Sequence, residues 1–533
     1  MVVESHKDAV TFKTRPINSL GAARCQAGRP TGTVVASSFV MQRIKYFVVI
    51  GIALQGSGGE SSPSVGGILP VDNPSATVDL ARTRARAMNG TYIAWREHII
   101  DDTGISGIAG SDGLELGDLD GDGNIDIVSV HEADTSYGNV VDGHVRVAFG
   151  SKDVGRWDLT TLIEGASAAA PEDVAIGDLN RDGYPDVMVA SELAHLVYLQ
   201  NPGGAAARTV PWRRLILPMT LDRGSYIRVF FADLDADGRL EVVAANKGAQ
   251  NPRMDTTQLN AISWFEVKGD PLLGTSWKEH EMGRVRIPIN SRPIDFDGDG
   301  DLDVFAGSRG EIRVFWYENV GKSEISFVER AIRIADTTVP NSERIANRPL
   351  DGRPLITGSH VDFSDLNHDG RMDVVLQEES NLVWLEQPER PLEAWPIHLI
   401  GTNWPDTVTG IELADIDGDG DLDAMTGSYS ADPRDRDGDG PVTDRLGRLA
   451  WFENPGDARQ QWTRHDISRR RRGMFDQFVA LDLDSDGDLD FVSTRANSVP
   501  FDGVFWLEQL RSDSPLQSFT RARFQDSQEV PLP

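Results

Sequence analysis

The chain has 533 residues, of which 52 are basic and 83 acidic, and its formal net charge is −31 at pH 7. This balance excludes the basic surface that binding to a nucleic acid backbone requires. The single cysteine, Cys25, excludes an intrachain disulfide, so an extracellular form of the chain needs another kind of stabilisation.

The N-terminal 60 residues contain a predicted export signal. From Met41, "MQRIKYFVVIGIALQGSGGESS" has a basic start, nine apolar residues from Tyr46 to Leu54, and then a small, polar segment, which is the order of a secretory signal. The alternative is a short buried strand, which would have the same apolar run. A membrane-spanning helix is excluded, because nine apolar residues are too few to span a bilayer. We predict a non-native or disordered extension at 1–40, a signal peptide at 41–60 and a secreted, periplasmic or cell-surface protein without stable membrane insertion.

A segment containing Gly, Ser and Pro at 61–90 is predicted to be a linker. The first predicted strand follows it, "YIAWREHII" at 92–100, and contains the pattern W-x-x-H, which returns several times later in the chain. This strand is one candidate to close the fold against its last repeat. The segment "FTRARF" at 519–524 is the other.

Seven copies of an acidic motif, D-x-D-x-D-G-x-x-D, follow at intervals of 50 to 70 residues. A fixed phrase at such intervals is typical of a repeat architecture. The copies begin at Asp118, Asp178, Asp233, Asp295, Asp365, Asp415 and Asp482.

Each repeat is predicted to contain four strands. The motif stands between two apolar stretches of period two, as in "EDVAIGDLNRDGYPDVMVA" at 172–190, and a third strand ends at turns such as "ENPGD" at 453–457. The fourth strand carries an aromatic residue, assigned to Phe519 in the last repeat, and W-x-x-H histidines that we interpret as packing positions. The prediction is an all-β, seven-bladed β-propeller of four-stranded antiparallel blades at 91–527, with a tail at 528–533 and an open solenoid as the alternative.

The motif has the spacing of a cation-binding loop. Side-chain oxygens stand at positions 1, 3, 5 and 9, the carbonyl of position 7 lies between them, and Gly at position 6 permits a sharp turn. Position 1 is given by the seven aspartates that begin the copies. The remaining predicted ligands are, at position 3, Asp120, Asn180, Asp235, Asp297, Asn367, Asp417 and Asp484; at position 5, Asp122, Asp182, Asp237, Asp299, Asp369, Asp419 and Asp486; at position 7, Asn124, Tyr184, Arg239, Asp301, Arg371, Asp421 and Asp488; and at position 9, Asp126, Asp186, Glu241, Asp303, Asp373, Asp423 and Asp490.

The chemistry of these ligands favours calcium. An oxygen-only shell with irregular geometry suits Ca²⁺, whereas Mg²⁺ requires a tighter octahedron and zinc prefers thiolate or imidazole. We therefore predict about seven structural Ca²⁺ sites, with acidic surface turns that bind no metal as the alternative. A loop at 435–444, "DRDGDGPVTD", begins in the same way and either binds an eighth ion or binds none.

The motifs inside a seven-fold β repeat, together with "WFENPGD" hairpins, resemble the FG-GAP/VCBS repeats of secreted bacterial proteins and are similar to the propeller of integrin α chains. The resemblance covers about residues 92–525. It implies a seven-bladed propeller with Ca²⁺ in the loops between first and second strands. It does not imply one function, because members act as adhesion modules, as carbohydrate-binding parts and as the bodies of some polysaccharide lyases and sugar dehydratases.

The predicted innermost strands are unexpectedly polar. Glu115, Asp173, Arg228, Asn290, Arg292, His360, Asp362 and Glu412 are expected near the mouth of the central channel. They form either a hydrated channel lined by salt bridges or a ligand site, for which Glu115, Asp173, Asp362 and Glu412 are the predicted ligand-binding residues. Unequal loops at 131–143, 246–260 and 427–448 are expected on the same face, either as binding loops or as unselected variation. "SRRRRG" at 468–473 is expected there too, as a solvated charge run or an attractor of an anionic polymer.

These features predict a monomeric, secreted calcium-binding propeller that acts as a binding or adhesion module for extracellular carbohydrate or a surface protein. The alternative is a carbohydrate lyase or dehydratase. In that enzyme, Arg228 and Arg292 would neutralise a substrate carboxylate while His360 or Tyr226 removes the neighbouring proton.

Overall fold

The chain divides into two compact units, Met1–Ile68 and Leu69–Pro533. The computed structural model describes residues 82–132, 143–193, 195–321, 324–335, 355–430 and 434–531, all within the second unit. The predicted extension at 1–40, the predicted signal at 41–60, the linker up to residue 81 and most of the loop at 131–143 lie outside the described residues. The helices within the described ranges are all too short to cross a membrane.

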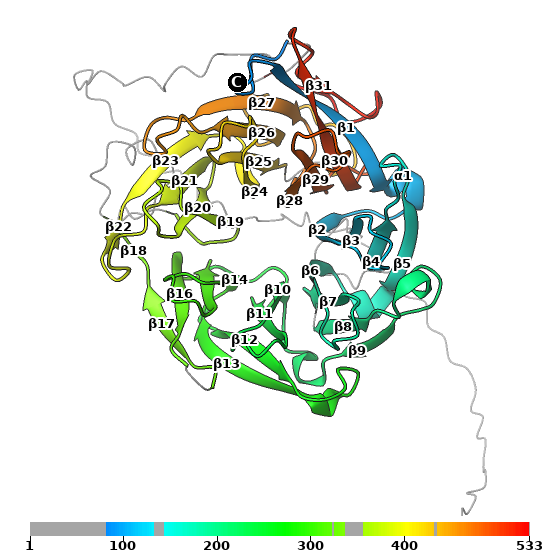
Figure 1. The fold of residues 1–533 in the computed structure, drawn as a ribbon, viewed down its shortest axis with the longest axis vertical. Coiled ribbons are helices and arrows are strands. Elements are labelled where there is room, and N and C mark those ends of the chain that lie inside the picture. Colours follow the sequence, from blue (N-terminus) through cyan, green and yellow to red (C-terminus); the bar gives the residue numbers. More distant parts are fainter. Residues whose placement is uncertain are drawn as a thin grey trace, which may run out of the picture. The chain divides into compact units, whose positions relative to one another are not determined.

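The second unit is an all-β propeller of seven antiparallel sheets arranged in a ring (Figure 1). Blades one to three contain, in order, β2 (Ser111–Gly117), β3 (Asp126–His131), β4 (His144–Phe149) and β5 (Asp158–Glu164); β6 (Pro171–Gly177), β7 (Asp186–Ser191), β8 (Leu196–Gln200) and β9 (Arg213–Ile216); and β10 (Tyr226–Ala232), β11 (Glu241–Asn246), β12 (Asn260–Val267) and β13 (Trp277–Val285). Blades four to six contain β14 (Pro288–Ile294), β15 (Asp303–Ser308), β16 (Arg313–Asn319) and β17 (Phe327–Ala331); β19 (Val361–Ser364), β20 (Asp373–Glu378), β21 (Asn381–Leu385) and β23 (Ile397–Thr402); and β24 (Thr407–Ala414), β25 (Asp423–Tyr429), β26 (Gly447–Glu453) and β27 (Thr463–Arg470). The predicted fold class is confirmed.

Short elements connect the blades or lie at their edges. They are α1 (Thr103–Ser106), η1 (Gly165–Ala168), η2 (Gly204–Ala206), η3 (Pro218–Thr220), η4 (Gly274–Ser276) and the parallel pair β18 (Arg333–Ile334) and β22 (Ala394–Trp395).

Blade seven contains strands from both ends of the propeller. Its order is β28 (Phe478–Leu481), β29 (Asp490–Arg495), β30 (Gly503–Ser512), β1 (Tyr92–Asp102) and β31 (Phe519–Thr520). The N-terminal strand β1 is therefore the fourth strand, and Phe519 belongs to a fifth strand that pairs with it in parallel. This corrects the assignment of Phe519 to the fourth strand, because β1 already fills the edge of β30.

The W-x-x-H histidines pack in the same way in four blades. Trp264 stacks on His280 with ring centroids 3.9 Å apart, and the pairs Trp384–His398, Trp451–His465 and Trp506–His98 repeat this contact. Each histidine also contacts a glutamate two residues after the tryptophan, as His465 does with Glu453 at 2.6 Å. The interpretation of these histidines as packing and hydrogen-bonding positions is confirmed.

The hydrophobic core lies mainly between adjacent blades. Between blades four and five, Phe296 stacks on Trp395 with ring centroids 5.6 Å apart, and both side chains are buried. Because each sheet is covered on both faces by its neighbours, its strands are apolar on both sides: in β7, Val187 packs in the cluster shared with blade one and Met188 in the cluster shared with blade three. Closing the ring therefore completes the core of every blade.

Both segments next to the propeller pack against it. In the described part of the predicted linker, Thr83 donates its backbone N–H to Leu516 and Met88 donates to Asp417. At the other end, Val530 of the predicted tail is buried and donates its N–H to the carbonyl of Arg469. The packed unit thus extends from at least residue 82 to residue 530.

Candidate functional site

The acidic loops join the first strand of each blade to the second, as the sequence predicts. They share one face, the lower face, with the loops between third and fourth strands. Arg208 from such a loop of blade two contacts Asp120 of blade one and reaches Asp122 at 2.9 Å. The other two classes of loop lie on the opposite face, the upper face, because strand direction alternates within a blade.

The first aspartate of each motif organises its own loop. In all seven copies its carboxylate accepts the backbone N–H of the position 6 glycine at 2.7 to 3.1 Å, as Asp118 accepts from Gly123. These glycines have φ between +80° and +99°, a region that residues with side chains rarely adopt. The motif glycine is therefore required by the backbone.

Several of these loops bring oxygens together closely enough to hold a metal ion. Carboxylate oxygens lie within 4.8 Å of one another in the groups Asp118/Asp120/Asp122, Asp233/Asp235/Glu241, Asp295/Asp297/Asp299 and Asp415/Asp417/Asp423. Burial and the neighbouring charge of Asp419 raise the pKa of Asp417 to about 6. A cation would relieve this repulsion, and the donor set of carboxylates and carbonyls suits a hard ion.

The position 9 side chain has a second function, which spacing alone does not indicate. Asp126 accepts one backbone N–H from Leu119 in its own loop and another from Gly150 after the third strand. Equivalent pairs of bonds are made by Asp186, Asp303, Asp373, Asp423 and Asp490. These buried carboxylates connect the acidic loop to the third strand of the blade.

The loop at 435–444 differs from the seven motifs. Its Asp437 accepts hydrogen bonds from Arg472 at 3.0 Å, from the hydroxyl of Ser527 at 2.7 Å and from the N–H of Gln528 at 2.8 Å. The carboxylate expected at position 3 of an eighth site is thus bonded to an arginine and to the C-terminal segment. An eighth ion at this loop stays a prediction.

Three of the predicted ligand-binding residues connect neighbouring inner strands. Asp173, Asp362 and Glu412 each use one carboxylate oxygen to accept a backbone N–H from the next blade. The donors are Val229, Leu413 and Ala480, at 3.0, 2.8 and 3.3 Å. These bonds give the three carboxylates a structural role, as the salt-bridged channel alternative expects, and their role in ligand binding stays a prediction.

Arg228 and His360 are brought together through a residue that the sequence analysis did not include. Asp476 lies 4.0 Å from Arg228 and 3.5 Å from the Nε2 atom of His360, while Asp173 lies 3.9 Å from Arg228 on the other side. Burial lowers the pKa of His360, although Asp476 opposes this shift, so the imidazole is neutral near pH 7. Asp476 precedes its motif by six residues, whereas the channel residues predicted from the sequence lie three or five residues before theirs.

The other two enzyme candidates lie apart from this group. Arg292 is 3.7 Å from Asp362 and donates to the carbonyl of Val361 at 3.1 Å, and 42% of its side chain is exposed. Tyr226 is buried in the apolar cluster between blades two and three with Val229 and Trp277, and this burial raises its pKa to about 12. The structure therefore does not bring Tyr226 together with Arg228 as a proton acceptor.

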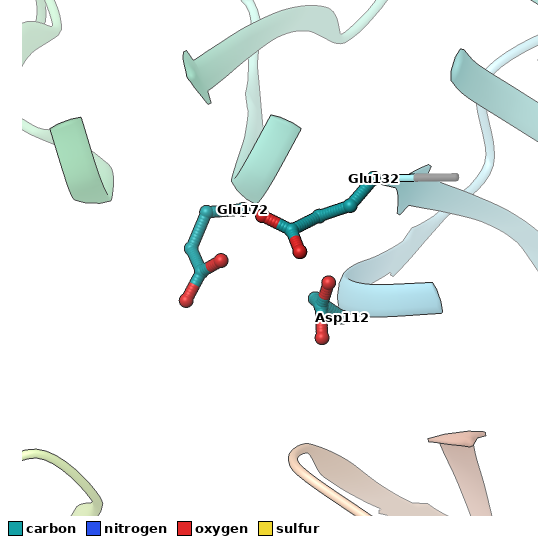
Figure 2. A group of neighbouring side chains, drawn as sticks. All are labelled: Asp112, Glu132 and Glu172. Carbon is teal, nitrogen blue, oxygen red and sulfur yellow. The ribbon is translucent and has the colours of Figure 1, made fainter. Parts of the chain in front are cut away.

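A further acidic group lies outside the motifs. Asp112, Glu132 and Glu172 place carboxylate oxygens within 4.8 Å of one another where blades one and two meet (Figure 2). Burial raises the pKa of Glu172, whereas the charges of Lys247 and Arg228 lower it. No spacing rule identifies this group, because Asp112 and Glu172 lie in the first strands of two repeats and Glu132 directly follows β3.

The carboxylates of the inner strands are expected to make stability depend on pH. Burial and Asp362 raise the pKa of Glu412 to about 8, so the folded state holds a proton that the unfolded state, with a pKa of 4.5, releases. Stability is therefore expected to fall as pH rises from about 4.5 to about 8. The melting temperature, measured against pH at constant calcium, should therefore decline less in Glu412→Gln than in the wild type. The control Glu393→Gln changes an exposed residue and should follow the wild type. Parallel wild-type and Glu412→Gln curves would contradict the prediction.

The family comparison agrees with the repeats of this architecture. A family described as FG-GAP-like repeat matches residues 118–189, 178–244, 295–346 and 365–426. A search of curated proteins gives no match. Among solved structures, a lectin from Agrocybe aegerita, described as recognising non-reducing terminal N-acetylglucosamine, aligns over 72% of this chain and 91% of its own, with 13% identity and a TM-score of 0.41. The four matched segments begin at acidic motifs and cover such loops of six blades, so this seven-bladed β-propeller is built with FG-GAP-like repeats.

Proposed function

We propose that this propeller is a calcium-binding extracellular module that binds carbohydrate on its upper face. Calcium is supported by the oxygen-only acidic loops, whose carboxylates repel one another without a cation. The extracellular location is supported by the predicted signal at 41–60.

The observation that carries the proposal is the exposed indole of Trp404. This residue lies on the upper face between β23 and β24, and 56% of it is exposed. Its neighbours Asn403 and Asp406 are both fully buried, and the N–H of Asp406 donates to the carbonyl of Asn403. The turn is thus anchored in the fold while its largest apolar side chain faces solvent.

Such a side chain suits a sugar better than most ligands. The flat indole offers a rigid apolar surface that can cover the C–H face of a pyranose, and its ring loses little conformational entropy on binding. Hydroxyl groups at the rim of the sugar can remain in water or bond to neighbouring polar groups. A surface protein is the alternative ligand, because tryptophan also anchors protein interfaces.

The test is an array of neutral and acidic oligosaccharides, followed by titration of the best binder. Trp404→Ala is expected to weaken binding about 30-fold or more, the usual effect of removing a central tryptophan anchor. Leu273→Ala is the matched control, because Leu273 is similarly exposed at 55% but lies in a loop on the lower face. Unchanged glycan binding by Trp404→Ala would refute the proposed site, and absence of any glycan binding by the wild type would favour a protein ligand.

One observation favours a second function, that of a carbohydrate lyase or dehydratase. The neutral His360 next to Asp476 is an arrangement that supports a general base, and Arg228 lies beside the same carboxylate. Incubation with acidic polysaccharides should then release unsaturated products, and His360→Ala and Arg228→Ala should abolish them. If the wild type releases none, the protein is a binding module.

A further inference from the structure

The C-terminal segment Asp526–Val530 lies along the outer strand of blade six. The N–H of Arg471 donates to the carbonyl of Gln528 at 3.1 Å, and the N–H of Val530 donates to the carbonyl of Arg469 at 2.8 Å. This is the pairing of an antiparallel strand added to the end of β27. The segment follows blade seven in the chain, so it crosses from one blade to its neighbour.

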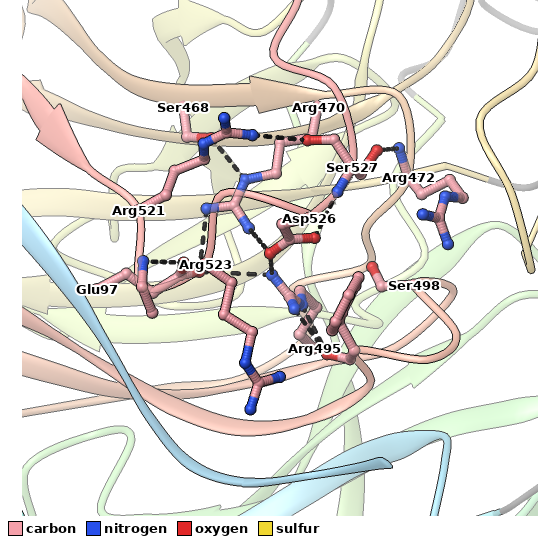
Figure 3. A network of polar contacts seen from close by, with 12 residues as sticks. Glu97, Ser468, Arg470, Arg472, Arg495, Ser498, Arg521, Arg523, Asp526 and Ser527 are labelled. Carbon is pink, nitrogen blue, oxygen red and sulfur yellow. Dashed lines mark hydrogen bonds and ion pairs between the residues drawn. The ribbon is translucent and has the colours of Figure 1, made fainter. Parts of the chain in front are cut away.

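Two buried arginines receive this segment (Figure 3). Arg470 and Arg495 come from blades six and seven, and the exposed fractions of their side chains are 0% and 2%. Asp526 bonds to both, at 3.0 Å from Arg470 and 2.7 Å from Arg495. Glu97 of β1 bonds to the same two arginines, at 2.9 and 3.4 Å. The cluster therefore joins the two ends of the propeller.

The arginine run thus differs from both interpretations made from the sequence. Arg469, Arg470 and Arg472 are buried, so "SRRRRG" is neither a solvated charge run nor an open surface for an anionic polymer. Buried arginines need carboxylate partners, because a charge without one is costly away from water. Although burial alone raises the pKa of Asp526, Arg495 and Arg470 lower it to about 2, so this carboxylate is charged at any ordinary pH.

Further contacts depend on the individual residues of the segment. The hydroxyl of Ser527 accepts the N–H of Arg472 at 3.0 Å, and Glu529 accepts from the hydroxyl of Ser468 at 2.7 Å. Val530 is buried, whereas Gln528 between them is exposed. Residues 526–530 therefore have the pattern Asp-Ser-x-Glu-Val, in which x is the exposed residue. The propeller contacts the side chains of this segment as well as its backbone.

We infer that residues 526–530 are a separable acidic peptide, and that Ser468, Arg470, Arg472 and Arg495 form a peptide-binding site which this chain occupies with its own C-terminal segment. Binding of the segment holds β1 in the ring, because Glu97 and Asp526 share the same arginines. This inference does not rest on the proposed carbohydrate ligand or on calcium in the seven acidic motifs. A second copy of the chain could supply the same segment.

The test separates the segment after folding. A protease cleavage site introduced at Phe524 and Gln525 should be cut readily in the folded protein, because Phe524 is 88% exposed. After the cut, the segment should remain bound in the folded protein. Once the segment is released, amide exchange should become faster in β1 and β27 but not in blade three. A synthetic peptide of residues 525–531 should then bind one to one and restore the slow exchange.

Matched peptides test the recognition. Asp526→Asn should weaken binding about a hundredfold, since it removes the charge that pairs with two buried arginines. The control peptide with Gln528→Ala should bind nearly as the unaltered peptide does, because that side chain is exposed and its hydrogen bond from Arg471, at 3.2 Å, lies at the surface.

Three results would overturn the inference. They are prompt loss of the cut segment with unchanged exchange in β1, failure of the peptide to bind the protein that has lost its segment, and equal binding of the Asp526→Asn peptide. If the protein without its segment unfolds, Asp526→Asn in the intact chain provides the second measurement. Wild-type exchange in β1 of that variant would equally exclude the proposed role.

Discussion

Excess chelator is expected to lower the free energy of unfolding of the propeller. The loss is about 2.7 kcal/mol for each loop that binds calcium, when the calcium concentration before chelation is a hundred times the Kd of that loop. The reason is the close approach of carboxylates such as Asp295, Asp297 and Asp299, whose oxygens lie within 4.8 Å of one another. Two such charges about 4 Å apart repel by roughly 4 kcal/mol at an effective dielectric constant near 20. Calorimetry with and without calcium measures the difference.

Single-loop variants locate the effect. Asp299→Asn should remove part of the calcium-dependent stability while a preparation that remains folded still binds its ligand. Asp513→Asn is the control, because Asp513 is exposed and lies outside every acidic loop. An identical melting curve in calcium and in chelator would show that the loops are acidic turns without a metal.

Asp406→Ala is expected to destabilise the protein by about 3–5 kcal/mol, the usual cost of leaving buried charges without their partner. Asp406 is fully buried and accepts from Arg448 at 2.8 Å and from two nitrogens of Arg469 at 2.6 and 2.8 Å. Its loss leaves Arg448 and Arg469 in the interior without this partner. Among the ion pairs of the described residues, Arg448 then keeps only the one with Asp466. Denaturant unfolding at constant calcium measures the change.

A surface pair provides the matched control. Asp255 pairs with Arg253 in a setting where both side chains are at least 70% exposed, so Asp255→Ala should leave stability almost unchanged. Combining Asp406→Leu with Arg469→Met should recover part of the loss, because apolar side chains can replace a buried ion pair. A loss for Asp406→Ala no larger than that of the control would show that the arginines find other partners.

The sequence alone allowed the local structure of each blade to be predicted. The motif glycine at φ near +90° and the aspartate that accepts its N–H are close in the chain, and three of the four stacked Trp–His pairs lie within one repeat. Seven repetitions made these patterns visible, and a closed ring is the arrangement that buries both faces of every sheet. Fold class and candidate metal loops could therefore be predicted.

Only the tertiary structure decided which polar residues act between repeats. Asp173, Asp362 and Glu412 form a similar series along the chain, yet each bonds to the backbone of the following blade, and Tyr226 turns into an apolar cluster. The arginine run could not be interpreted either, because Arg495 and its partner Glu97 are separated by 398 residues. Such a contact occurs once and has no period, and burial of the charges depends on the ring closing around them.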